Sequence, residues 1–231
     1  MRVAIIPARA GSKRISRKNI KHFFGRPILA WSIEAAIKSR CFDQIICTTD
    51  DDEIASIAQK YGAETPFVRP KDLSGDYIGT IPVISHAIEH LQSNGNKIDL
   101  ACCIYATAPF IQAIDLQNSL EQMQNNKLDF CFSATSYPFP IQRSIRIKSN
   151  KRCEMLDSEM FQKRSQDLEE LYHDAGQFYW GTPQSWLEGR ALFSNDTMPY
   201  ILPRHRVQDI DTLEDWKRAE LMFKALKDEL V

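Results

Sequence analysis

The sequence predicts an α/β protein with a mostly parallel sheet and helices on both of its faces. Short apolar runs of strand length alternate with longer stretches of helical periodicity along most of the chain. The chain has 231 residues, enough for one domain with a substantial core, and no linker rich in Gly, Pro or Ser divides it. We therefore expect a single domain over residues 1–231.

The predicted strands are four apolar runs, at residues 3–6, 44–49, 99–105 and 130–135. The predicted helices are at residues 27–39, 53–61, 81–92, 114–125 and 213–226. Pro27 suits the first turn of the first helix, because an N–H would be unpaired there anyway. Gly62 suits the position after the second helix, where positive φ is common. Acidic residues 50–53 precede that helix, and we interpret them as a cap in preference to a metal site.

Residues 137–163 interrupt the alternation of strands and helices. This stretch contains prolines, polar turns and short extended pieces such as residues 144–148. Such a composition suits neither a core strand nor a long helix. We interpret the stretch as an inserted arm, which continues to about residue 170.

The composition argues against some classes of partner. The net charge of −1 gives no bulk attraction to nucleic acid or to a membrane, so we expect neither as a partner. No apolar run approaches the roughly 20 residues of a membrane helix, and the first residues do not resemble a signal peptide. The six cysteines include no C-x-x-C pair. We expect reduced core cysteines in a cytoplasmic protein, with a metal site or catalytic thiol as the alternative.

The stretch at residues 7–19 directly follows the first predicted strand and is rich in cations. It contains five Lys or Arg residues together with one Gly and two Ser. Backbone N–H groups, hydroxyls and cationic side chains can together surround a polyanion. Neither G-x-x-x-x-G-K-[ST] nor G-x-G-x-x-G is present. The residue types indicate a phosphate-binding loop, with a solvated basic loop as the alternative.

The order of residues 6–19, IPARAGSKRISRKN, resembles the opening motif of the cytidylyltransferases that activate nine-carbon acidic sugars. That motif is I-P-A-R-x-G-S-K-x-[IL]-x-x-K-N, and every fixed position is matched. The family includes the CMP-sialic acid synthetases and the pseudaminic acid cytidylyltransferases. The resemblance continues to Asp211. It implies a Rossmann-like nucleotide-diphospho-sugar transferase sheet and the transfer of CMP from CTP to the anomeric hydroxyl of a nonulosonic acid, with release of pyrophosphate.

The resemblance also implies roles for the residues of the first loop. Arg9, Ser12 and Lys13 would hold the β- and γ-phosphates of CTP. Lys18 would stabilise charge on the α-phosphate, and Asn19 would support the loop or the nucleotide. Backbone groups of the loop would recognise the cytosine base. The other nucleotide-binding candidates are Ala8, Ala10, Gly11, Arg69 and Thr107.

Asp209 and Asp211 lie in an extended segment just before the last predicted helix. Acids at i and i+2 of such a segment point to the same side. Two carboxylates suit Mg²⁺, which keeps waters and phosphate oxygens in its shell. Capping of the helix is the alternative for this D-x-D pattern. The family carries D-x-D at this place, so the resemblance implies a Mg²⁺ site.

The segment after the third strand departs from the family pattern. Tyr105-Ala106 stand where the family usually has Gln-Pro, and that Gln helps to hold the sugar acid in sialic acid enzymes. The sequence of residues 174–180, DAGQFYW, also differs from the sequence usual in the family. Both differences favour the pseudaminic acid branch, which implies a role in flagellin glycosylation. The candidates for binding the sugar are Tyr105, Arg164, Gln166, Gln177 and Tyr179, with core packing as the alternative for the aromatics.

The resemblance implies a homodimer, because the family's corresponding arm exchanges between subunits. The expected small-molecule partners are CTP and a nine-carbon acidic sugar. N-acetylneuraminic, legionaminic and 3-deoxy-octulosonic acids are alternatives to pseudaminic acid. His86 and His90 fit H-x-x-E-H, so a zinc hydrolase is a remote alternative to histidines that pack or face solvent. A non-catalytic nucleotide-binding protein is a further alternative, although D-x-D and Lys18-Asn19 argue against it.

Overall fold

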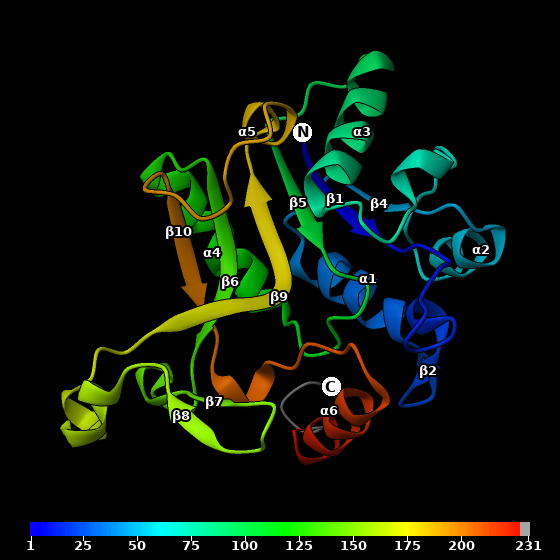
Figure 1. Cartoon of the computed structure of the whole chain (residues 1–231). Helices are drawn as coiled ribbons and strands as arrows, with labels where there is room; N and C mark the ends of the chain where they lie inside the picture. Colours follow the sequence, from blue (N-terminus) through cyan, green and yellow to red (C-terminus); the bar gives the residue numbers. More distant parts are fainter. Residues whose placement is uncertain (227–231) are drawn as a thin grey trace.

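A six-stranded sheet lies at the centre of the computed structural model, which describes residues 1–226 (Figure 1). The strand order is β10-β6-β9-β5-β1-β4. The strands are β1 (Arg2–Pro7), β4 (Gln44–Thr48), β5 (Leu100–Ile104), β6 (Phe130–Ser136), β9 (Tyr172–Gly181) and β10 (Thr197–Ile201). Strand β9 is antiparallel to β5 and β6, and the other neighbouring pairs are parallel. The predicted mostly parallel sheet is confirmed.

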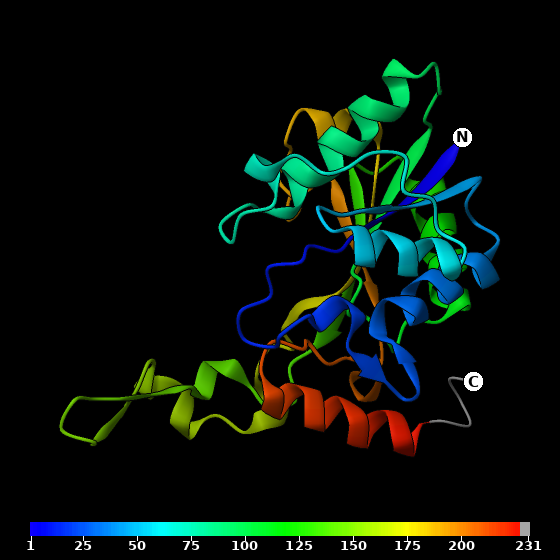
Figure 2. The same cartoon turned by 90° about the vertical axis from the view of Figure 1, so that its right-hand side faces the viewer.

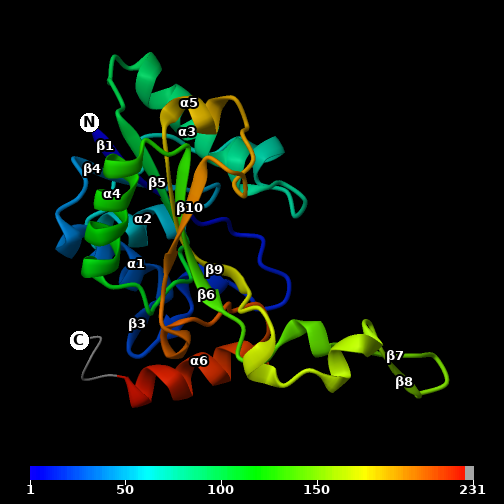
Figure 3. The same cartoon turned by 90° about the vertical axis from the view of Figure 1, so that its left-hand side faces the viewer.

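Helices cover both faces of this sheet (Figures 1 and 3). They are α1 (Ile28–Ser39), α2 (Asp52–Lys60), α3 (Thr80–Ser93), α4 (Ala113–Asn126), α5 (Pro183–Leu187) and α6 (Leu213–Ala225). One core contains Leu29 of α1 and Leu116 of α4. The other contains Ile84 of α3 and Trp186 of α5. No helix in the described part of the chain is long and apolar enough to cross a membrane.

The continuously apolar sequence of β1 is explained by its burial on both faces of the sheet. Val3 and Ile5 point into one core, and Ala4 and Ile6 point into the other. All four residues are fully buried. A strand in the middle of a sheet covered on both faces has no solvent side, so polar residues do not alternate with apolar ones.

A third core closes the carboxyl end of the sheet. It joins α6 to Phe23 of the short strand β2 (His22–Phe23), which pairs with β3 (Arg26–Pro27). The ring of Phe223 contacts the ring of Phe23 at a centroid distance of 5.2 Å. Ile210 is fully buried in this core. The segment that carries Asp209 and Asp211 is therefore packed against the end of the sheet.

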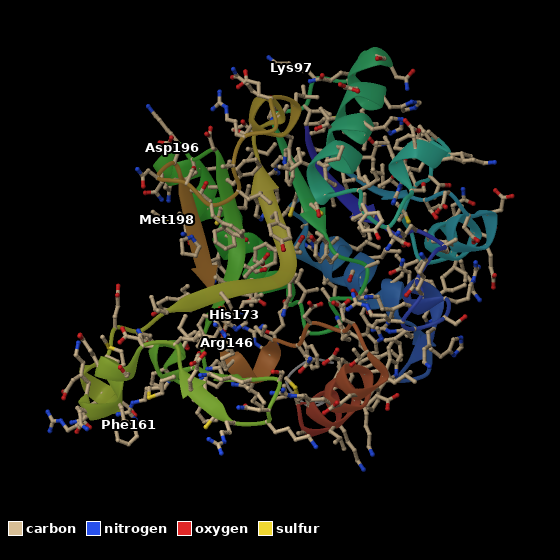
Figure 4. The ribbon with its side chains drawn as sticks, viewed as in Figure 1. Lys97, Arg146, Phe161, His173, Asp196 and Met198 are labelled. Carbon is tan, nitrogen blue, oxygen red and sulfur yellow. The ribbon has the colours of Figure 1, made fainter. Side chains whose placement is uncertain are left out.

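The arm lies between β6 and β9 in the chain and extends away from the sheet (Figures 2 and 3). It contains a separate antiparallel ladder of β7 (Ile145–Ile147) and β8 (Cys153–Met155). Figure 4 shows Arg146 and Phe161 on the arm and Lys97 at the opposite end of the molecule. Several large apolar side chains of the arm face solvent.

The structure corrects one predicted helix end and confirms two others. Pro27 is the N-cap of α1, one position before the helix, and not part of its first turn. Asp51 caps α2, because its carboxylate accepts the N–H of Ile54 at 2.9 Å. Gly62 follows α2 with a φ of +100°, as predicted. Strands β9 and β10 were not predicted at all.

Candidate active site

A cavity of about 530 Å³ opens at the carboxyl ends of β1 and β5. Strand β1 connects forward to β4 on one side, and β5 lies on its other side. This reversal of strand order is where open α/β sheets bind their ligands. The lining contains most of the predicted nucleotide-binding side chains: Arg9, Ser12, Lys13, Lys18, Asn19, Arg69 and Thr107, together with Tyr105 and Asp211.

Two side-chain hydrogen bonds fix the backbone of the first loop. The N–H of Ala10 donates to Oδ1 of Asp50 at 3.0 Å. Nδ2 of Asn19 donates to the carbonyl oxygen of Arg9 at 2.9 Å. Gly11 has no neighbouring heavy atom within 4 Å of the position a Cβ would take. The loop backbone is therefore fixed just before Gly11, and a Cβ at Gly11 would meet open space.

Arg17 fixes the far end of the loop. Its backbone lies in the left-handed region with φ of 53°. Its guanidinium donates to both carboxylate oxygens of Asp51, at 2.6 and 3.0 Å, and also pairs with Glu53. This hydrogen-bonded ion pair holds the pKa of the Asp51 carboxyl below its usual range. Asp51 thus both caps α2 and anchors the loop.

The ion pair predicts a pH-dependent stability effect of Asp51→Asn, which keeps a capping side chain but removes the charge. We expect the free energy of unfolding to fall by about 1 kcal/mol at pH 7. Because the folded pKa is lowered, the lost stabilisation exists above the ordinary Asp pKa and disappears as the pH falls through the folded value. Urea unfolding at pH 7 and pH 3 measures the gap. A gap of equal size at both pH values would contradict the assignment, and Asp52→Asn is the control at the next, exposed position.

Asp76 joins two of the loop's cations. Its Oδ1 accepts from Nη1 of Arg9 at 2.7 Å, and its other oxygen pairs with Lys13. These two partners, Lys13 first, lower the pKa of the Asp76 carboxyl. A carboxylate therefore lies where the predicted phosphate-binding cations converge. Asp76 is not among the predicted site residues, because an acid in an exposed loop carries no local signal of this pairing.

Lys18 links the first loop to the segment that precedes α6. Its Nζ donates to the carbonyl oxygen of Ile210 at 2.6 Å and lies 3.2 Å from Oδ1 of Asp211. Oδ2 of Asp211 pairs with Nη2 of Arg14 at 2.8 Å. Residues almost two hundred positions apart in the chain thus meet at one wall of the cavity.

Asp209 lies beside this cluster. The residue is exposed and is not among those that line the cavity, but neighbouring protein crowds its carboxyl, which the charge of Asp211 also affects. Both effects, crowding first, raise the pKa of Asp209, and Lys18 opposes them. A pair of mutually repelling carboxylates, one of which lines the cavity, is chemically suited to a divalent cation.

Two further side chains shape the cavity wall. Arg69 is buried, and its guanidinium donates to Oγ1 of Thr48 at 3.1 Å and to the Thr48 carbonyl. Burial lowers the pKa of Arg69. Tyr105 shares a hydrogen bond of 2.8 Å with Oγ1 of Thr80, and burial raises the pKa of Tyr105 to about 12. Its hydroxyl therefore stays protonated and can donate to a ligand.

Comparisons with known proteins agree with this geometry. A family model described as Cytidylyltransferase matches residues 3–206. The chain belongs to the cytidylyltransferase family. A pseudaminic acid cytidylyltransferase of Campylobacter jejuni subsp. jejuni serotype O:2 is 45% identical over 222 residues, which cover 96% of each chain. A CMP-N,N'-diacetyllegionaminic acid synthase of Legionella pneumophila subsp. pneumophila is 30% identical and covers 99% of each chain.

A solved structure supports the fold of this cytidylyltransferase. The CMP:2-keto-3-deoxy-manno-octonic acid synthetase complexed with CTP superposes with a TM-score of 0.69 over 97% of this chain and 98% of the other. The sequence identity of that pair is 14%, so the likeness concerns the fold alone. The family model and the relatives identify the protein as a CTP-dependent nucleotidyltransferase, and the solved structure agrees with its Rossmann-like sheet.

The predicted sugar-binding residues fall into two groups. Tyr179 packs on Tyr105, with ring centroids 5.3 Å apart, and its hydroxyl donates to Asp174 at 2.6 Å. Gln177 is buried, and its Nε2 donates to the carbonyl oxygen of Arg206 at 2.7 Å. Both lie behind the wall of the cavity and not on its surface.

Arg164 and Gln166 form the second group, because both lie on the arm. The guanidinium of Arg164 pairs with Asp167 at 2.7 and 3.0 Å, and its side chain is largely exposed. Gln166 lines a separate hollow of about 290 Å³ formed by residues 137–142, 165–166 and 168–171. The fold of one chain does not bring these two residues to the cavity at β1 and β5.

The histidines of the H-x-x-E-H pattern have another explanation. The rings of His86 and His90 both contact Phe67, at centroid distances of 5.0 and 4.6 Å. Nε2 of His90 also forms a hydrogen bond with Asn94. Within residues 1–226, no group of three or more His, Cys, Asp or Glu side chains could hold a metal ion. A zinc hydrolase is therefore not supported, and the two-carboxylate set at Asp209 and Asp211 would need ligand oxygens to complete a metal site.

A larger hollow, of about 780 Å³, lies at the opposite end of the sheet. Its walls come from the start of β5, the end of α4 and the segment around α5. The ion pair between Asp129 and Arg190 lies there, at 2.6 Å. The hollow lacks the run of cationic side chains that surrounds the cavity at β1, so charge as well as position favours the latter as the active site.

Proposed function

We propose that this cytidylyltransferase transfers CMP from CTP to the anomeric hydroxyl of pseudaminic acid. The observation that carries the proposal is the meeting of the cationic first loop with the Asp209–Asp211 segment around one cavity. The 45% identity to a pseudaminic acid cytidylyltransferase over nearly the whole chain supports the choice of sugar. Tyr105-Ala106, in place of the Gln-Pro usual in sialic acid enzymes, supports it independently.

The positive side chains of the cavity suit the triphosphate of CTP. Arg9, Ser12 and Lys13 would bind the β- and γ-phosphates, taking the place of the Asp76 carboxylate on the two cations. Lys18 would face the α-phosphate. The sugar hydroxyl oxygen forms a bond to the α-phosphorus, the bond from that phosphorus to the pyrophosphate oxygen breaks, and the hydroxyl proton leaves to water. Phosphoryl transfer of this kind depends mainly on alignment and neutralised charge.

Asp209 and Asp211 would hold Mg²⁺ against the phosphates of bound CTP. The residues present fit such an ion, because Asp211 lines the cavity and its charge acts on the carboxyl of Asp209, whose pKa it helps to raise. When bound, Mg²⁺ would neutralise phosphate charge and polarise the phosphorus. Lys18 and Arg14 orient Asp211, so they would set the direction of this carboxylate.

We also propose that the enzyme is a homodimer in which the arm of each subunit reaches its partner. The arm exposes Phe139, Ile147 and Phe161 to 77%, 72% and 66%, which is unusual for large apolar side chains clustered on one segment. In such a dimer Arg164 and Gln166 would approach the sugar site of the other subunit, where a guanidinium suits a carboxylate. The free cysteines at 41, 47, 102, 103, 131 and 153 support a reducing, cytoplasmic location.

If the arm makes the dimer, a charge introduced on the arm should weaken dimerisation strongly. Ile147→Glu should raise the dimer dissociation constant more than about tenfold, because a carboxylate would be buried without a partner. Sedimentation velocity over a range of concentrations measures this. Val68→Glu is the matched control, since Val68 is 71% exposed but lies far from the arm in the chain. An unchanged constant for Ile147→Glu, or an equal loss for Val68→Glu, would contradict an arm-mediated dimer.

The choice of sugar is tested by release of pyrophosphate with CTP and Mg²⁺. Pseudaminic, legionaminic and N-acetylneuraminic acids are offered in parallel. We expect release with pseudaminic acid and little with the other two. Release with legionaminic acid alone would keep the mechanism and change the substrate. Legionaminic acid is the first alternative because a relative named for it is 30% identical to this chain. CTP binding without release for all three would contradict the proposed reaction on these sugars.

A further inference from the structure

The segment that carries Asp209 and Asp211 has almost no regular structure of its own. It follows a single 3-10 turn at Arg204–Arg206 and ends at the N-cap of α6, Thr212. A segment without helix or strand hydrogen bonds needs other contacts to hold two carboxylates in a fixed place. Lys18 supplies one of these contacts from the first loop, at the carbonyl oxygen of Ile210.

A buried ion pair holds the other end of the segment. Nη1 and Nη2 of Arg206 donate to the two carboxylate oxygens of Asp115, at 2.6 and 3.0 Å. The exposed fractions of the two residues are 9% and 1%. Asp115 is itself fixed, because it is the third residue of α4 and accepts the N–H of Gln112 in a capping box. Arg206 lies three positions before Asp209, so this pair restrains the approach to the carboxylates.

The backbone of Arg206 is tied to the sheet as well. Its carbonyl oxygen accepts from Nε2 of the buried Gln177 at 2.7 Å. The carbonyl oxygen of Gln177 in turn accepts the N–H of Tyr105 at 2.9 Å. Tyr105 lines the cavity together with residues of the cationic loop. Arg206 therefore connects the Asp209–Asp211 segment to the cavity wall after β5, through Gln177 and Tyr105, and to the start of α4, through Asp115.

We propose that Asp115 and Arg206 are positioning residues, which hold the Asp209–Asp211 carboxylates in the orientation that binds the metal. The inference rests on the proposed function, since it assumes a divalent cation at these carboxylates. A buried ion pair is a poor source of net stability compared with apolar side chains of similar size. Its bidentate geometry does fix direction, as contacts behind metal ligands generally do. Neither residue would touch the metal or the substrates.

The test measures binding of Mn²⁺, used in place of Mg²⁺, by the electron paramagnetic resonance signal of free Mn²⁺. It uses the full chain with CTP and without sugar, so the readout does not depend on turnover. Arg206→Lys keeps the charge but cannot donate two parallel hydrogen bonds to Asp115. Asp115→Leu/Arg206→Met replaces the pair by apolar side chains. We expect Mn²⁺ affinity to fall roughly tenfold to a hundredfold in both. CTP affinity without divalent cations should change less than about twofold, because the cationic loop is untouched.

A matched control is the ion pair between Asp129 and Arg190 at the other end of the sheet, replaced as Asp129→Leu/Arg190→Met. This control should leave Mn²⁺ affinity unchanged. Unchanged Mn²⁺ affinity in Arg206→Lys or in a folded double variant would overturn the inference and leave the proposed function standing. An equal fall in metal-free CTP affinity would also overturn it, because the pair would then be merely structural. If the unsubstituted enzyme bound no Mn²⁺ with CTP, the proposed metal role would fall together with the inference.

Discussion

Lys18→Ala should lower kcat roughly a hundredfold to a thousandfold while the enzyme remains folded. Nζ of Lys18 lies at the junction of the cationic loop and the Asp209–Asp211 segment, 3.2 Å from Oδ1 of Asp211. The charge that develops on the α-phosphate during transfer would meet this ammonium group. Its loss removes an interaction that strengthens as that charge develops, so kcat should fall more than the affinity for CTP. Steady-state pyrophosphate release at saturating CTP and Mg²⁺ measures the effect.

The control for Lys18→Ala is Lys38→Ala. Lys38 is exposed on α1 and pairs with Glu34 of the same helix at 3.2 Å. Its replacement removes an equal charge without touching the cavity, so activity should stay within about twofold. Near-normal kcat in a folded Lys18→Ala variant would remove Lys18 from the mechanism.

The double variant Asp209→Ala/Asp211→Ala should lose Mg²⁺-dependent activity, by on the order of a thousandfold. The two carboxylates are the acidic pair of the segment before α6, and Asp211 lines the cavity. Without them, Mg²⁺ would have only the phosphates of CTP to hold it, and its position relative to Lys18 would no longer be fixed. Initial rates measured over a titration of Mg²⁺ give both the maximal rate and the half-saturating concentration.

Glu214→Gln provides the control for this loss. Glu214 is exposed in the first turn of α6, so its replacement removes a nearby carboxylate without changing the candidate metal ligands. It should retain the Mg²⁺ dependence of the unsubstituted enzyme. A double variant whose rate still rose with Mg²⁺ to a similar maximum would place the metal elsewhere.

The sequence predicted the buried strands β1, β4, β5 and β6 because each is a continuous apolar run between turn residues. It did not predict β9, whose first half contains His173, Asp174 and Gly176 and resembles a loop. That half lies at a register shift against β6, where the strand leaves the sheet toward the arm. It did not predict β10 either, because Pro199 argues against a strand. β10 lies at the edge of the sheet, where a missing N–H is tolerated.

The cationic loop of the site could be predicted from the sequence, but the residues that hold it in place could not. The cationic loop is a local pattern, so its motif alone placed Arg9, Lys13 and Lys18 there. The partners of the loop come from distant elements, such as Asp50 for the N–H of Ala10 and Asp76 for Arg9. No local pattern distinguishes these acids from solvent-exposed ones. The same holds for Asp115 and Arg206, which are 91 positions apart and would each look like an ordinary surface residue.

The central claim is that the cavity transfers a nucleotide to a sugar acid, and labelled CTP tests it most directly. The enzyme is incubated with Mg²⁺, pseudaminic acid and CTP labelled at the α-phosphate, and the products are separated. The account predicts that the label moves into a CMP-sugar, while label placed at the γ-phosphate leaves as pyrophosphate. Label released from the α-phosphate as free CMP, with or without sugar, would show hydrolysis and contradict the account.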